Sequence, residues 1–310
     1  MADFLTHAIF AEDVLNGLVE RKIKFEITKR KKLFILGSQG PDMFFYYNFW
    51  PWKNSSEIVQ IASMIHNHKS GLFLSEGIQY SLNDKSENSR YDLLTYIIGF
   101  ICHFHLDKNI HPYVCFCSKN TIFKRDGSCT SVTHLELESR IDIIYTREKR
   151  GEFASKINLY KLFDIIPLPA IISDFYIYVL KRLFHITTTS SHIEKCVADM
   201  KTGLRLQYDP KGIKHFLLKT LCIKPPKPLY TKTENKEIDW LNRGRKEWHH
   251  PDDLKEKYTL SVDDIYENAL KDCIFTINSL FERIESQKKF DDLFPNISYL
   301  TNKPCQDSIT

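Results

Sequence analysis

The sequence has no hydrophobic run long enough to cross a membrane. Its longest apolar stretch, residues 93–102, includes a threonine and a glycine and is far shorter than the ~20 residues that a membrane span needs. The first residues show no basic region followed by a long apolar stretch, so no secretory signal is visible. We therefore expect a soluble, cytoplasmic protein.

The sequence also lacks a strong charge of one sign. A formal net charge of +4 over 310 residues is too small to indicate binding to nucleic acid or to an anionic membrane. We therefore expect no stable nucleic-acid partner. The one dense basic run, residues 29–32, could contact phosphate or a lipid head group, but we interpret it as a solvated surface segment.

The eight cysteines form no CxxC pair and no compact framework, which argues against a disulfide scaffold. Cys115 and Cys117 could act as a pair of zinc ligands, but their spacing does not match a zinc knuckle. We interpret all eight as reduced thiols in the core or on the surface.

Helical periodicity dominates what is present, and no alternating strand signal of any length occurs. A hydrophobic fraction of 43% with 26% charged residues allows a large buried core. We therefore predict an all-α, multi-helix bundle. Helices are expected over residues 3–20, 57–68, 71–82, 91–109, 133–148, 157–165, 169–187, 191–206, 210–221, 238–246 and 262–287.

Two pairs of potential metal ligands, each a histidine and a carboxylate, share the same spacing. His103 precedes Asp107 by four residues, and His134 precedes Glu138 by four. In a helix, residues four apart lie on the same face, so each pair presents an imidazole and a carboxylate to one point. Zinc binds such mixed nitrogen and oxygen donors. The spacing therefore predicts a metal centre, most simply with more than one ion.

The helix expected over residues 91–109 is nearly apolar on all sides, which is typical of a central buried helix. Uncompensated polar groups there would cost several kcal/mol, and a bound cation removes this cost. His111 supplies a third imidazole just before Pro112. Because proline disfavours the α conformation in the preceding residue, we predict that His111 leaves the helix and turns toward a second ion.

Several short motifs surround these pairs in a fixed order. They are Thr6-His7, Gly40-Pro41-Asp42, His66-x-x-Lys69-Ser70-Gly71, Gly99-Phe100-Ile101-Cys102-His103 with Asp107, His111-Pro112-Tyr113, and Thr133-His134 with Glu138. Together these motifs, over roughly residues 1–145, resemble the bacterial zinc-dependent phospholipase C family, whose fold is shared by the fungal zinc nucleases that cut single strands.

The resemblance implies three zinc ions in a cleft between helices. By position, Asp42, His66, His103 and Asp107 resemble the ligands of one ion. His111, His134 and Glu138 resemble those of a second ion. His7, with Asp107 as a bridging carboxylate, resembles part of a third site.

The third site departs from the family pattern. Well-studied secreted members complete it with the N-terminal residue of the mature chain, whereas six residues precede His7 here, with no leading tryptophan. We therefore expect two firmly held zinc ions and a third that is weaker or completed by water. Residues 1–150 would form this metal-binding core. Residues 151–310 would add helices to the same domain, with a possible loop linker over 224–236.

Neighbouring histidines have simpler interpretations. His105 lies two residues from both His103 and Asp107, nearly on the opposite face of the helix, and we interpret it as a packing residue. His66 is favoured over His68 as a ligand because of the Lys-Ser-Gly that follows. The aromatic stretch over residues 44–52 reads mainly as core, although one or two of its rings could line the mouth of the cleft.

The resemblance implies a zinc-dependent hydrolase of phosphate esters, most simply a phospholipase C-like phosphodiesterase. Zinc would neutralise charge on phosphate oxygens and lower the pKa of water to roughly 7. Asp42 would either ligate zinc or accept the proton of the attacking water. The expected substrate is a phospholipid or a small phosphodiester, with transient contact to a membrane surface. A single-strand nuclease on the same fold and a non-catalytic, metal-stabilised binding protein are the alternatives; the sequence leaves the oligomeric state open.

Overall fold

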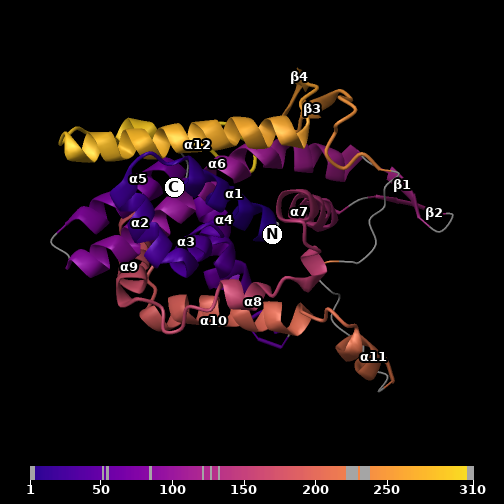
Figure 1. Ribbon diagram of the computed structural model, residues 1–310, viewed down its shortest axis with the longest axis horizontal. Coiled ribbons are helices and arrows are strands. Elements are labelled where there is room, and N and C mark those ends of the chain that lie inside the picture. The colour runs from indigo at the N-terminus through magenta and orange to yellow at the C-terminus, as the bar shows by residue number, and fades with distance from the viewer. Residues whose placement is uncertain are drawn as a thin grey trace.

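The computed structural model describes residues 4–50, 52–53, 56–83, 86–120, 122–125, 128–131, 133–220, 230 and 238–305. Within them, helices dominate, and the strands form only two small antiparallel hairpins. The predicted all-α fold is therefore confirmed. Figure 1 shows one body of packed helices, from which α11 and the β1–β2 hairpin project.

The first part of the chain supplies eight helical segments and one hairpin. They are α1 (Phe4–Gly17), α2 (Arg21–Lys29), α3 (Lys31–Gly37), the 3-10 helix η1 (Gly40–Tyr46), α4 (Ser56–Asn67), α5 (Ser70–Leu82), α6 (Glu87–Asn120), β1 (Ile122–Arg125), β2 (Ser128–Ser131) and α7 (His134–Arg150).

The second part supplies the remaining helices and a second hairpin. They are η2 (Ala154–Lys156), α8 (Leu159–Leu162), α9 (Ala170–Phe184), α10 (Ser190–Gln207), α11 (Ile213–Thr220), β3 (Trp248–His250), β4 (Asp253–Tyr258), α12 (Val262–Glu285) and η3 (Asp291–Leu293).

The centre of the fold is α6, which packs against α1, α3, α5, α7, α9 and α12. Its residues from Leu93 to Asp107 are buried without a break, as its apolar character predicts. The approach of α3 to α6 depends on glycine, because a Cβ on Gly37 would collide with the carbonyl oxygen of Tyr96. Gly99 of α6 likewise lies against the carbonyl oxygen of Phe34. These backbone contacts hold α3, and with it the turn that leads to η1, directly on α6.

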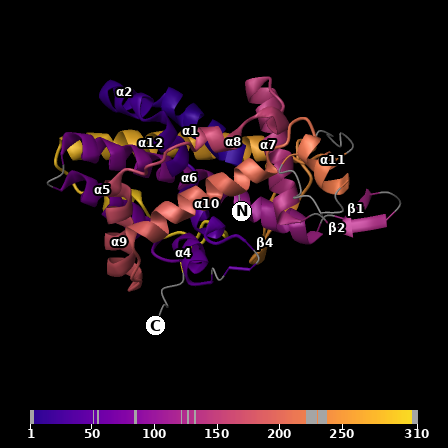
Figure 2. The same cartoon turned by 90° about the horizontal axis from the view of Figure 1, so that it is seen from below.

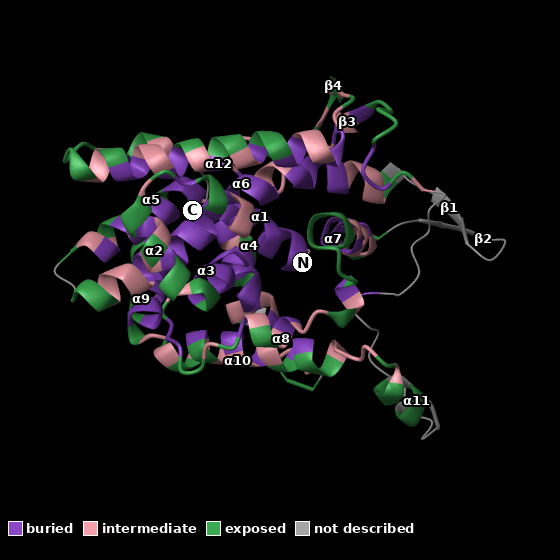
Figure 3. Ribbon diagram, in the orientation of Figure 1, coloured by how far each residue is buried: buried purple, intermediate pink, exposed green. Residues whose placement is uncertain are grey.

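Two layers cover opposite sides of α6. The long helix α12 runs beside it, with an exposed outer face and a buried inner face (Figure 3). A capping box between Ser261 and Asp264 defines the beginning of α12. On the other side α9 and α10 pack together (Figure 2). Helix α10 also contacts η1. The predicted linker over 224–236 lies outside the described residues except for Tyr230, and the predicted domain division stays a prediction.

The prediction that the central helix ends before Pro112 is wrong. Helix α6 continues through Pro112 to Asn120 and keeps His111 within it. Ile110, Tyr113 and Val114 are all buried, so packing on both sides of the proline outweighs the local preference against helix.

Other boundaries also differ from the prediction. No helix forms over 238–246, because side chains satisfy the backbone there instead: the Asp239 carboxylate accepts from the amides of Arg243 and Gly244, and Asn242 bonds to Lys246 and Leu260. The two hairpins and the short helices α2 and α3 were not predicted. None of the helices that the structure describes combines the length and apolar character that a membrane crossing requires.

Candidate metal centre

One cluster of donors forms where η1 and the end of α4 meet the middle of α6. Asp42 Oδ1 lies 3.3 Å from Nε2 of His66. His66 is oriented by its other ring nitrogen, since Nδ1 lies 2.7 Å from the carbonyl oxygen of Ala62 and donates to it. Donor atoms of Asp42, His66 and His103 all lie within 4.8 Å of one another, which is close enough to share one ion.

Gly40 is required by this arrangement. Its φ is +53°, a left-handed conformation that glycine adopts without strain, and a Cβ at this position would overlap the ring of His103. The turn that projects Asp42 can therefore approach α6 only through a glycine.

Asp107 lies at the middle of the centre and is almost completely buried. Its Oδ1 is 3.5 Å from Nε2 of His7. Its Oδ2 is 3.5 Å from Nε2 of His66, 3.6 Å from Nε2 of His103 and 3.0 Å from Nδ1 of His111. Because its two oxygens face different imidazoles, Asp107 can bridge two ions.

A second cluster joins α6 to the first turn of α7. Glu138 Oε1 lies 3.3 Å from Nε2 of His111 and 2.9 Å from Nε2 of His134. The Thr133 side chain caps α7 by accepting from the amide of Glu136, which fixes where the pair begins. The His134 side chain is 33% exposed whereas Glu138 is 3% exposed, so the centre meets the surface at His134.

A third cluster is formed by His7, His103 and Asp107. Helix α1 carries His7, whose ring stacks on that of His103 with centroids 4.4 Å apart. The structure thus brings all eight predicted ligands together. Two details differ from the prediction: His103 contributes to the third cluster as well as to the first, and Asp107 belongs to the third cluster but not to the first.

Three of the separations between donor atoms match the spacing of zinc ligands, whereas the 2.9 Å from His134 to Glu138 and the 3.0 Å from His111 to Asp107 are those of direct hydrogen bonds. Ligand atoms 2.0–2.1 Å from a tetrahedral zinc ion lie about 3.3 Å from one another. The distances from His66 to Asp42, from His7 to Asp107 and from His111 to Glu138 are 3.3, 3.5 and 3.3 Å, longer than a normal N–H···O bond. Within the described residues, neither ring nitrogen of the fully buried His103 has a hydrogen-bond partner. A bound cation would give one of these nitrogens the partner that it lacks.

The protonation equilibria of the centre follow from burial opposed by pairing. Burial favours neutral imidazole, but the facing carboxylates of Asp107 and Asp42 raise the pKa of His66 to about 9. Burial is likewise outweighed at His134, where bonds with Cys115 and Glu138 raise the pKa to about 9. At His103 burial prevails and lowers the pKa to about 3, so this ring is neutral near pH 7.

Asp142 positions His7 and was not predicted. It lies four residues after Glu138 on α7, and its carboxylate accepts from the amides of Leu5 and Thr6 at 3.0 and 2.7 Å and from the Thr6 hydroxyl at 2.7 Å. The Tyr230 hydroxyl also donates to Asp142. Asp142 therefore satisfies the first amides of α1, one residue before His7. The continued four-residue spacing on α7 was the available signal.

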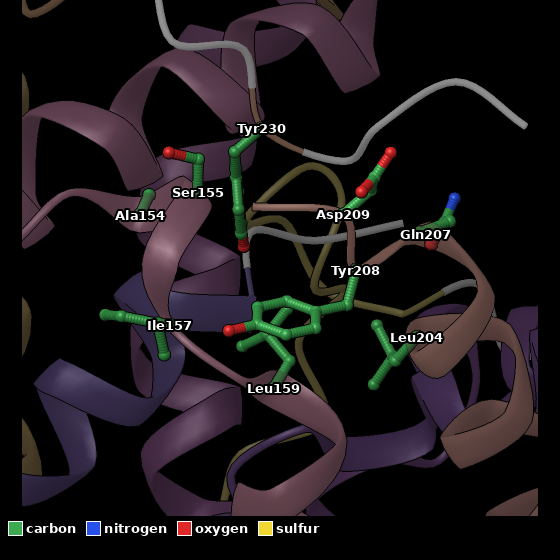
Figure 4. A pocket seen from close by; sticks show the side chains of 9 residues that line it. All are labelled: Ala154, Ser155, Ile157, Leu159, Leu204, Gln207, Tyr208, Asp209 and Tyr230. Carbon is green, nitrogen blue, oxygen red and sulfur yellow. The ribbon is translucent and has the colours of Figure 1, made fainter. Parts of the chain in front are cut away.

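Tyr230 also contributes to a nearby pocket. It lines a hollow between the η2 region and the end of α10, together with Tyr208 and Leu204 (Figure 4). This pocket lies beside the anchor of α1 rather than among the predicted ligands. No donor of the three clusters lines it.

Tyr299, near the C-terminal end of the chain, contacts two of the predicted ligands, His66 and His111, through its backbone. The Tyr299 amide donates to the carbonyl oxygen of His66 at 2.8 Å, and the Tyr299 carbonyl accepts from Nδ1 of His111 at 3.2 Å. The Tyr299 ring also packs against His66 and His103 with centroids 5.1 and 5.7 Å apart. No sequence motif indicates this role, because it depends on backbone groups 188 residues from His111.

The neighbouring residues fall largely as predicted. His68 and His105 belong to none of the three donor clusters. His105 is buried and lies edge-on to Phe104. Of the aromatic stretch, Phe44 is buried, whereas Trp52 is exposed and stacks on Trp50.

The fold and the donors together define an all-α protein with a buried centre able to hold clustered metal ions. The sequence matches the family model of zinc dependent phospholipase C over residues 6–187, more than half of the chain. The chain therefore belongs to the zinc-dependent phospholipase C family, and the matched range contains all eight predicted ligands. No curated protein and no solved structure matches the chain.

Proposed function

We propose that this chain is a zinc-dependent phosphodiesterase of the phospholipase C type, acting on a phospholipid or a smaller phosphodiester. One observation carries the proposal: five imidazoles and three carboxylates from α1, η1, α4, α6 and α7 form three contiguous clusters of donors. Such a set of nitrogen and oxygen donors suits zinc. Membership of a zinc-dependent family supports the same assignment.

The protein's own residues would bind and orient the ions. When bound, zinc would supply Lewis acidity, which offsets charge on phosphate oxygens and lowers the pKa of water. Asp107 would link neighbouring sites through its two oxygens. The Ala62 and Tyr299 carbonyls fix the rings of His66 and His111, so that their Nε2 atoms face the carboxylates.

Asp42 stays ionised beside these histidines. Burial would raise its pKa, but the interaction with the charged ring of His66 holds the pKa of Asp42 well below its ordinary value. Its Oδ1 faces His66, which supports a role as ligand, and the carboxylate retains an oxygen able to accept a proton. A substrate phosphate would approach from the side of His134, the most exposed of the ligands in the second cluster.

Contact with a membrane surface would be transient and would be made by exposed aromatic side chains. Trp52 is 73% exposed and stacks on Trp50 with ring centroids 5.1 Å apart. Tryptophan is favoured at the membrane–water interface because its ring is apolar and its indole N–H is polar. Neither ring is among the donors, so a Trp52→Ala variant tests lipid contact separately from metal binding. It should sediment less with phosphatidylcholine vesicles and keep its turnover of a soluble substrate.

The deciding experiment measures metal and turnover on the same preparation. Protein purified without a histidine tag is analysed for metals by mass spectrometry. It is then assayed on bis-p-nitrophenyl phosphate, short-chain phosphatidylcholine and a single-stranded oligonucleotide, each with and without chelator. About two to three zinc ions per chain and chelator-sensitive release of a phosphorylated head group would support the proposal. Preferential cleavage of the oligonucleotide would favour a nuclease instead.

A matched pair of variants separates catalysis from folding. His103→Ala removes a donor, whereas His105→Ala removes an equally buried imidazole from the same helix that belongs to no donor cluster. We expect only His103→Ala to lose metal and turnover. If wild-type protein held zinc, hydrolysed none of the substrates and lost its fold on His103→Ala, the metal would have a structural role and the proposal would be wrong.

A further inference from the structure

Helix α11 presents an apolar face to solvent. Its residues Ile213, Phe216 and Leu217 are 55%, 66% and 53% exposed. Because residues three and four positions apart lie on one face of a helix, these side chains form one continuous patch, the α11 face. Figure 1 shows that α11 projects from the packed body. Helix α2, in contrast, turns its apolar residues Ile23 and Ile27 into the core. An exposed apolar face of this kind indicates an interaction surface.

The charged residues around the α11 face are all basic. Residues 210–220 contain Lys211, Lys214 and Lys219 and no acidic residue. The net charge of the whole chain is small, but salt limits the reach of a surface charge to about 8–10 Å, so the local lysines decide which partner this face attracts. A short helix with apolar residues on one face and lysines beside them is typical of helices that lie in the surface of an anionic membrane.

Helix α12 offers an instructive contrast. Its Phe275 is 69% exposed, slightly more than Phe216. However, α12 carries six acidic and only two basic residues, so an anionic lipid surface would repel it. Exposure of a phenylalanine alone therefore does not select a partner. The combination of exposed apolar residues with basic charge is what favours anionic lipid at α11.

Lys214 holds α11 at the end of α10. Its Nζ donates to the carbonyl oxygens of Arg205 and Tyr208 at 2.9 and 3.0 Å, in the last turn and at the C-cap of α10. Figures 1 and 2 both place α11 at the end of the body that holds α7. Helix α7 begins at His134, where the metal centre meets the surface. A membrane bound to α11 would therefore lie at the same end of the molecule as α7.

We propose that α11 binds the surface of an anionic membrane. Ile213, Phe216 and Leu217 enter the boundary between head groups and acyl chains, and the lysines lie against lipid phosphates. The inference deepens the function proposed above, since it supplies a contact that keeps a lipid hydrolase at its substrate. The eight residues of α11 span about 12 Å, so the helix lies along the membrane and does not cross it. The contact proposed for Trp52 is separate and needs no anionic lipid.

Sedimentation of the full chain with vesicles tests the inference. The vesicles contain phosphatidylcholine alone or phosphatidylcholine mixed with phosphatidylglycerol. Phe216→Ala should bind the mixed vesicles about tenfold more weakly, because it removes buried apolar area. Lys211→Glu should weaken the same binding by about tenfold, and added salt should weaken binding of the wild type. Phe275→Ala and Lys271→Glu are the matched controls at exposed positions of α12 and should bind like the wild type.

Turnover separates this inference from the function proposed above. In Phe216→Ala, hydrolysis of vesicle lipid should fall relative to hydrolysis of soluble bis-p-nitrophenyl phosphate. A wild type that hydrolyses short-chain phosphatidylcholine but does not prefer the mixed vesicles would overturn the inference and leave the function intact, as would equal binding by Phe216→Ala and the wild type. Binding through α11 without hydrolysis of any phosphodiester would support the inference and overturn the function. If Phe216→Ala changed only self-association, the α11 face would bind a second copy of the chain, and the membrane inference would be wrong.

Discussion

Replacing Asp142 with asparagine should disturb the third donor cluster while leaving every predicted ligand in place. The carboxylate accepts the amides of Leu5 and Thr6 and the Thr6 hydroxyl, which fixes the beginning of α1. His7 is the next residue. Asparagine has nearly the same shape, but its amide group would meet N–H donors where an oxygen is needed.

The cost can be worked from these contacts. A hydrogen bond to a charged group contributes about 1.5–3 kcal/mol, and a buried donor left unpaired costs about 1–3 kcal/mol. Asp142 is fully buried, and asparagine would lose one charge-assisted bond and leave one amide of α1 unpaired. We therefore expect Asp142→Asn to lower the free energy of unfolding by about 3 kcal/mol.

Urea unfolding and metal titration together test this reasoning. Asp142→Asn should first lose the ion of the third cluster, because the beginning of α1 then holds His7 less firmly. It should keep the ion at His134 and Glu138. Asp174→Asn is the matched control, because Asp174 is exposed on α9 and its loss should change stability by no more than about 0.5 kcal/mol. Equal stability and equal metal content in Asp142→Asn and the wild type would refute the anchoring role.

Three further predictions concern the centre itself. Zinc affinity should rise between pH 7 and pH 9, because His66 and His134, whose metal-free pKa values are both about 9, must release protons before they bind; titrations that show no slope would contradict this. Gly40→Ala should lower the zinc content, because the added Cβ would displace His103. Gly212→Ala is the control: Gly212 also has a positive φ but lies in open space, so this variant should lose only about 1–2 kcal/mol to backbone strain and keep its zinc. Metal analysis and thermal unfolding measure both effects. If the free zinc concentration is 1,000-fold above Kd, chelation should remove about 4 kcal/mol of stabilisation for each ion, which lowers Tm by roughly 8 °C per ion. An unchanged Tm would mean that no metal had been bound.

The part of the site that is local in sequence could be predicted from the residues alone. The pairs His103–Asp107 and His134–Glu138 each lie within one helical turn, so spacing is sufficient to place both donors on one face. His7, Asp42 and His66 have no such local signal, and only the resemblance to a family placed them. Their meeting depends on how α1, η1 and α4 pack on α6.

What could not be predicted depends on tertiary contacts. Pro112 lines a pocket with Trp248 and Tyr258, and burial of its neighbours keeps α6 helical through a residue that locally favours a break. The role of Tyr299 uses its backbone groups, which every residue type carries. The periodicity over 238–246 wrongly predicted a helix. Asn242, at a φ of +51°, turns the chain, and its side chain forms hydrogen bonds with backbone groups that a helix would have paired with one another.

The electrostatics of the centre indicate that metal binding follows folding. Three buried carboxylates, Asp42, Asp107 and Glu138, face three histidines whose pKa values are raised in the metal-free protein. Paired as imidazolium and carboxylate, these six groups are neutral together, so the fold does not depend on a cation to offset buried negative charge. Entry of zinc would then exchange bound protons for the ion, and His103, already neutral, would provide a donor without any proton to lose. We therefore expect the chain to fold first and to bind metal afterwards.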